Sequence, residues 1–98
     1  MQQDLLRYLY QVSLKASHRW QDSGDVIIEQ TFGVISQLTY LLLTCHPDVT
    51  SIYHQLNHSF RILKSQLMHT LPLNMRADIH RIQSIMERAN LVMVPFTD

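Results

Sequence analysis

The feature that most constrains this chain is a run of apolar residues in alternating steps of four and three, which occurs twice. The first run comprises Val49, Tyr53, Leu56, Phe60, Leu63 and Leu67, and the second comprises Met75, Ile79, Ile82, Met86, Ala89 and Met93. A mean step of about 3.5 residues places each set on one narrow face of an α-helix, as in helices that pack against each other. The sequence therefore predicts a protein built from helices that lie side by side.

Turn-forming residues divide the chain into four segments of helical length. Gly24, Pro47 and Pro72 mark three turns, and Pro95 marks a tail. The predicted helices cover about residues 4–20, 26–44, 48–69 (or 50–69) and 74–90. We therefore predict an all-α fold, a compact four-helix bundle of up-down-up-down topology with short turns, in which residues 1–98 form a single domain.

The segment 26–44 carries apolar residues nearly all round the helix, which predicts that it lies at the centre of the bundle. Cys45 follows this segment and is predicted to be a buried thiol with a structural role. The predicted core comprises Leu38, Leu41, Leu56, Phe60, Leu63, Ile79 and Ile82.

The composition predicts self-association in a reducing compartment. Only 16% of the residues are charged, the net charge is zero, and 46% are apolar, so apolar surface is left for a second copy of the chain to cover. A symmetric homodimer is the simplest outcome. We predict a cytoplasmic protein from three observations. The chain has a single cysteine, it shows no signal peptide, and its apolar run at 32–45 is too short to span a membrane.

The sequence carries no pattern of a catalytic site. It has no glycine-rich phosphate loop, no nucleophile-elbow motif and no dense carboxylate cluster, so we predict a protein that is not an enzyme and needs no cofactor. His54 and His58 are four residues apart on one helical face, a spacing that can bind zinc. No third ligand lies nearby in the sequence, so surface histidines are the preferred interpretation.

The abundance of helix-packing patterns favours a binding protein that regulates or chaperones another protein through a helical face. We expect the contact surface on the last helix and the apolar tail that follows it, because methionine and aliphatic side chains there can receive a partner helix. The candidate residues are Met86, Leu91, Val92, Met93, Val94 and Phe96.

The alternative is a small dimeric DNA-binding transcriptional regulator. Five basic residues in the last two helices can form a strip that contacts phosphates: Arg61, Lys64, Arg76, Arg81 and Arg88. The neutral net charge is unlike the basic excess that is typical of nucleic-acid binders.

Scattered positions across about residues 16–90 resemble the small enterobacterial biofilm and acid-resistance regulators of the YmgB type. They are the segment DSGDVIIE at 22–29, the segment DVT at 48–50 and the segment RADI at 76–79. The chain departs from that pattern in lacking Asn-Lys at the start of the third helix and in a longer last hairpin at 69–74. The resemblance implies a short, all-helical, non-enzymatic dimer that connects to two-component signalling or binds DNA, and it implies no site residues.

Overall fold

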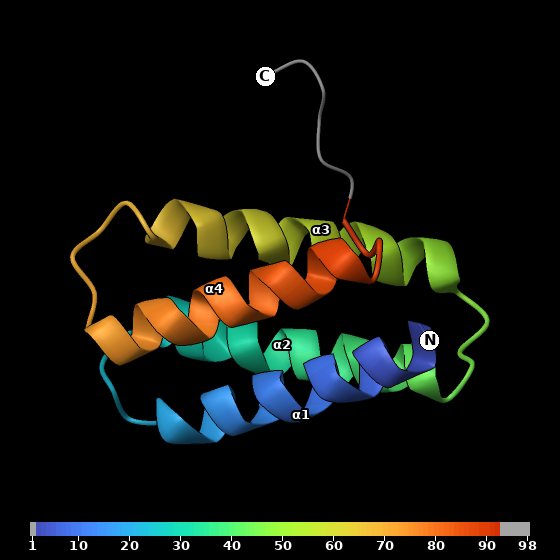
Figure 1. Cartoon of the computed structure of the whole chain (residues 1–98), viewed down its shortest axis with the longest axis horizontal. Helices are drawn as coiled ribbons and strands as arrows, with labels where there is room; N and C mark the ends of the chain where they lie inside the picture. The colour runs from blue at the N-terminus through green and yellow to red at the C-terminus, as the bar shows by residue number, and fades with distance from the viewer. Residues whose placement is uncertain (1, 93–98) are drawn as a thin grey trace, which may run out of the picture.

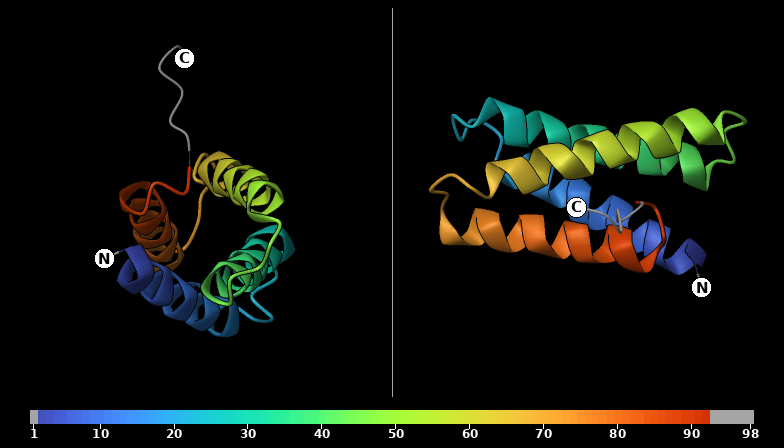
Figure 2. Two further views of the ribbon diagram at one scale, coloured as in Figure 1. Left: turned by 90° about the vertical axis from the view of Figure 1, so that its right-hand side faces the viewer. Right: turned by 90° about the horizontal axis from the view of Figure 1, so that it is seen from above.

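The computed structural model describes residues 2–92 as four α-helices, with no strand in this range. Helix α1 covers Gln2–Arg19, α2 covers Val26–Leu43, α3 covers Val49–Gln66 and α4 covers Leu73–Arg88. Successive helices run in opposite directions (Figure 1), and the end-on view shows all four arranged around a common centre (Figure 2). The predicted all-α bundle of up-down-up-down topology is therefore confirmed.

The helix ends follow local backbone chemistry. Asp48 caps α3, because its Oδ1 accepts a hydrogen bond from the backbone N–H of Ser51 at 3.2 Å. Gly24, in the turn before α2, has a φ of 89°, a left-handed conformation that glycine adopts at little cost. Asp25 precedes α2, but its side chain makes no capping hydrogen bond.

One hydrophobic core runs between the four helices. Five of the seven predicted core residues are buried, namely Leu38, Leu56, Leu63, Ile79 and Ile82, while Leu41 and Phe60 are half-buried and pack at its edge. Leu9, Ile28, Phe32, Ile35 and Met75 are among the other residues buried at its centre. Helices α1 and α2 approach each other most closely, whereas α3 and α4 meet at few points.

The prediction that α2 lies at the centre of the bundle is wrong. Helix α2 packs on α1 and α3 around the shared core (Figure 2), and the side chains on its outer side are exposed. Each helix of a four-helix bundle buries only the stripe that faces the core and its two neighbours. Apolar residues around the rest of α2 are therefore left uncovered.

The prediction that Cys45 is buried is also wrong. Its side chain is exposed, and its backbone has a φ of 59°. The N–H of His46 donates to the carbonyl of Leu41 at 3.0 Å, and that of Cys45 donates to the carbonyl of Leu42 at 3.2 Å. This is the Schellman arrangement, which places Cys45 just beyond the helix in the left-handed position and away from the core.

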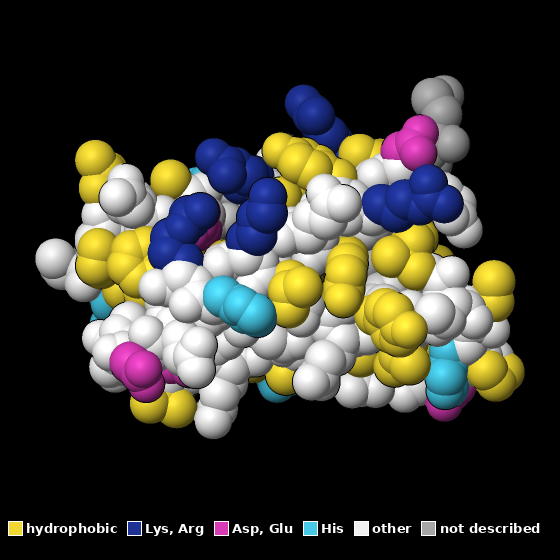
Figure 3. All heavy atoms as spheres, turned by 90° about the horizontal axis from the view of Figure 1, so that it is seen from below, with side chains coloured by type: hydrophobic (Ala, Val, Ile, Leu, Met, Phe, Trp, Pro, Cys, Tyr) yellow, Lys and Arg dark blue, Asp and Glu magenta, His cyan; other side chains and the backbone are white. Residues whose placement is uncertain are grey.

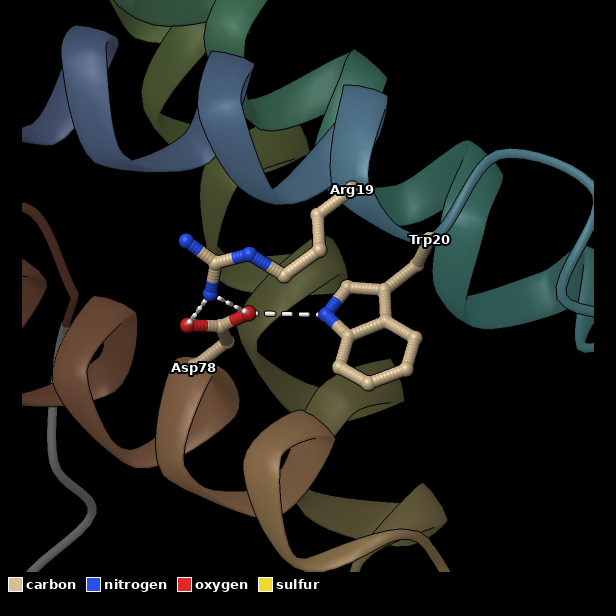
Figure 4. A network of polar contacts seen from close by, with 3 residues as sticks. All are labelled: Arg19, Trp20 and Asp78. Atoms are coloured by element: carbon tan, nitrogen blue, oxygen red, sulfur yellow. Dashed lines mark hydrogen bonds and ion pairs between the residues drawn. The ribbon is translucent and has the colours of Figure 1, made fainter.

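A polar contact fastens α1 to α4 where the two helices meet (Figure 4). The carboxylate of Asp78, which is only 3% exposed, accepts from Arg19 Nη1 at 2.9 and 3.0 Å and from Trp20 Nε1 at 2.7 Å. Every described buried side-chain nitrogen or oxygen has a hydrogen-bond partner. Asp78 is thus a charge held inside the protein by two partners from the end of α1.

Candidate functional site

The prediction of a contact surface on α4 and the tail is wrong for the three predicted residues that the structure describes. Met86 is 0% exposed, Leu91 is 2% exposed and Val92 is 9% exposed, so all three belong to the core. Met93, Val94 and Phe96 lie outside the described residues.

The cause is a second Schellman arrangement, at the end of α4. Asn90 has a φ of 56° and its N–H donates to the carbonyl of Glu87 at 3.1 Å, while the N–H of Leu91 donates to the carbonyl of Met86 at 3.0 Å. An apolar contact commonly accompanies this motif, and Leu91 and Met86 both lie in the core. Asparagine is a common residue at this left-handed position, so Asn90 was the signal in the sequence that could have predicted this helix end.

The five basic residues of the DNA-binding alternative do not share one face. Arg76 is half-buried, and its Nη1 donates to the carbonyls of Leu67 at 3.0 Å and His69 at 3.1 Å, which closes the turn between α3 and α4. Arg61, Lys64, Arg81 and Arg88 are exposed.

Arg81 and Arg88 follow Asp78 by three and ten residues, so they lie along the side of α4 that faces α1. Lys15 and Arg19 are exposed on α1 at a spacing of four, and Arg19 reaches Asp78 on α4. Figure 3 shows dark-blue basic side chains gathered on the face of the bundle where α1 is nearest the viewer. Sequence reasoning missed Lys15 and Arg19, because only the fold shows which helix is adjacent to α4.

The histidine pair lies on the outside of α3. His54 and His58 are exposed and line an open recess of about 540 Å³, together with Val34 of α2 and Asp48. Among the described residues, no group of three or more His, Cys, Asp or Glu side chains is placed to hold a metal ion.

The outer face of α2 carries four exposed large apolar residues, more than any other described helix. Val26 is 57% exposed, Ile27 is 53%, Val34 is 40% and Tyr40 is 52%. The two other exposed residues of α2 are Gln30 and Gln37, so no exposed position of this helix carries a charge. Glu29, the only charged residue of α2, is half-buried.

Grooves border this face on both sides. Between α2 and α3 lie two recesses, one beside Val34 and one beside Ile27, with His58 in the lining of both, and we call the two together the α2–α3 groove. Between α1 and α2 lies a recess of about 550 Å³, lined by Leu14, Ser17, Gly33 and the rings of Tyr10 and Tyr40, whose centroids are 5.8 Å apart. A ridge with a groove on either side is the shape that a second helix packs against.

Helix α2 is also the one described helix that is long and apolar enough to cross a membrane by length and composition. A core helix of a soluble bundle passes the same test, and 39% of α2 is buried inside the bundle. This property is therefore weak evidence for a membrane span.

Comparison of the chain with protein-family models, with curated proteins and with solved structures found no match. The resemblance to the YmgB-type regulators therefore stays a prediction.

Proposed function

We propose that the protein is a non-catalytic interaction module of the cytoplasm, a regulator or chaperone of another protein that binds a partner helix on the outer face of α2. The observation that carries the proposal is the combination of half-exposed apolar side chains and no exposed charge along this helix. The exposed and unpaired Cys45 supports a reducing compartment.

The energetics favour a helical partner. Complete burial of a Val or Ile side chain contributes about 1.5–3 kcal/mol, and each of Val26, Ile27 and Val34 retains roughly half of that gain for a partner to complete. Because no exposed position of α2 is charged, covering the helix itself removes no ion of α2 from water, and the charged residues beside it, Asp48 and Arg61, line the flanking groove. A partner helix can place its side chains in the grooves on both sides of α2.

Val34→Glu is the sharpest test of this face. A glutamate there introduces a charge at the centre of the contact, and the bundle tolerates it because Val34 is 40% exposed and outside the buried core. We expect the variant to stay helical by circular dichroism and to lose the proteins that the native chain captures from extracts of its source cell, identified by mass spectrometry.

The matched control is Val49→Glu, which makes the same substitution at a position of 38% exposure on α3. It should retain the captured proteins. Equal capture by the native chain and by Val34→Glu would contradict the proposal.

A second candidate function, DNA binding, is favoured by the basic side chains that the fold brings together on α1 and α4. Lys15, Arg19, Arg81 and Arg88 are exposed on this pair of helices, although Asp78 partly neutralises Arg19 and the net charge of the chain is zero. Binding through phosphate contacts should strengthen as salt is lowered.

If this function is right, a gel-shift titration at about 50 mM salt should show duplex DNA bound by the native protein, since few counterions compete there. Arg81→Glu combined with Arg88→Glu should abolish the shift. Arg61→Glu with Lys64→Glu changes the charge equally on α3 and should leave most of the binding intact. Absence of a shift at tens of micromolar protein would exclude this function.

A further inference from the structure

The outer face of α2 shows the same order of residue types from its N-terminal end as from its C-terminal end. An exposed apolar pair, Val26 and Ile27, opens the face, and the exposed Tyr40 with the half-buried Leu41 closes it. One glutamine lies inside each pair, and Gly33 and Val34 occupy the middle.

An antiparallel copy of the helix, centred between Gly33 and Val34, would match these positions in register. Gln30 would then lie opposite Gln37, where the two amides can donate and accept hydrogen bonds in both directions. Val26 would lie opposite Leu41, and Ile27 opposite Tyr40, so apolar surface would meet apolar surface at both ends.

Gly33 is a second, independent indication that a helix approaches this face. Glycine inside a helix costs about 1 kcal/mol relative to alanine, so it is usually kept where something needs the space. The bundle itself does not need it, because a Cβ at Gly33 would lie 3.6 Å from Ser17 Oγ, an ordinary van der Waals contact. A missing side chain lets two helix backbones come closer together, and Gly33 lies at the midpoint of the face along α2, on the edge of the face that borders α1.

The charges beside the face select the antiparallel direction. Asp48 lines the part of the α2–α3 groove beside Val34, at the start of α3, and Arg61 lines the part beside Ile27, further along α3. A two-fold axis reverses the groove of the second copy, which brings its Arg61 end toward the Asp48 end of the first. A parallel arrangement would bring acid beside acid and base beside base.

From these three observations we infer that the helix bound on this face is α2 of a second copy of the chain, packed antiparallel about a two-fold axis near Gly33 and Val34. The inference rests on the proposed function, because it names the partner of the same face. The contact is isologous, so each copy presents the same residues and the assembly closes as a dimer.

Sedimentation equilibrium of the full chain over micromolar concentrations tests the inference. We expect the native protein to have twice the mass of the 11.5 kDa chain. Val34→Glu should raise the dimer dissociation constant by at least about tenfold, a change that corresponds to about 1.4 kcal/mol. Val49→Glu should leave it unchanged.

Gly33→Ala separates the dimer contact from the stability of the bundle. In dilute solution, where the protein is monomeric, alanine should raise the urea midpoint, because it is the better helix former and its Cβ meets no clash. At higher concentration the same variant should form less dimer than the native chain. More dimer from Gly33→Ala would overturn the inference.

A disulfide cross-link between two copies of the chain tests the position of the two-fold axis. In a Cys45→Ser background, Val34→Cys should form a disulfide-linked dimer under mild oxidation, because a residue beside the axis faces its own copy. Val49→Cys is the control and should remain monomeric.

A monomeric native protein overturns the inference whatever else is observed. If that monomer still captures another protein and loses it through Val34→Glu, the proposed function stands and only the identity of the partner is wrong. If neither the mass nor the capture depends on Val34, both proposals fail. Binding of the native chain to neutral phospholipid vesicles, lost in Val34→Glu, would assign the face to a lipid surface and overturn both.

Discussion

Replacing Leu63 by alanine should lower the free energy of unfolding by about 2–5 kcal/mol, the range measured for leucine-to-alanine changes in protein cores. Leu63 is 0% exposed and is the last buried residue of the core-facing stripe of α3. The change removes apolar atoms from the core and leaves a cavity, which adds to the cost because the surrounding helices relax only partly. Urea unfolding followed by circular dichroism measures the loss.

Leu73→Ala is the matched control, because it removes the same atoms from a leucine that is 82% exposed at the start of α4. Its effect should stay within about 0.5 kcal/mol, as is usual for surface substitutions away from special features. If Leu63→Ala proved as stable as Leu73→Ala, the packing of α3 described above would be wrong.

The spacing of apolar residues and the turn-forming residues together predicted the four helices, and the spacing predicted the buried face of α4 in detail. Met75, Ile79, Ile82, Met86 and Ala89 are all buried. The equivalent stripe on α3 was predicted less well, since Val49 and Tyr53 at its start are 38% and 37% exposed. Periodicity defines a face of a helix, whereas burial also depends on how closely a neighbour approaches, and α3 and α4 meet at few points.

The spacing of apolar residues did not predict the candidate site on the outer face of α2, for a related reason. Apolar residues nearly all round α2 are expected both for a helix enclosed by its own chain and for one that is partly covered by another molecule. Only the arrangement of the neighbours distinguishes the two, because Ile28 and Ile27 are adjacent in the sequence yet 0% and 53% exposed.

The sequence also did not predict the contacts between residues that are distant along the chain. Asp78 is 59 residues from Arg19 along the chain, and no spacing in the sequence indicates that the two side chains meet. In the structure, Asp78 is buried and binds Trp20 at the end of α1. Arg76 donates a hydrogen bond to a backbone carbonyl at the turn that precedes its own helix.

Asp78→Ala should lower the free energy of unfolding by about 2–3 kcal/mol, because it removes a buried acceptor that serves the half-buried Trp20 and the exposed Arg19. The indole N–H of Trp20 donates at 2.7 Å and would lose its only observed partner. Arg19 would lose less, because its side chain is 51% exposed and its guanidinium can return to water. Trp20 is the single tryptophan of the chain, so its fluorescence reports on this contact during urea unfolding.

Asp78→Asn separates the two donors. The amide keeps an oxygen that can accept from Trp20 Nε1 but loses the ion pair with Arg19, so its cost should be about 1 kcal/mol, smaller than that of alanine. Adding Arg19→Ala to each variant completes a double-mutant cycle, and the coupling between Arg19 and Asp78 should stay below about 1 kcal/mol, since half of the arginine side chain is in water. Equal losses for Asp78→Asn and Asp78→Ala would mean that the ion pair with Arg19, rather than the hydrogen bond from Trp20, holds α1 to α4.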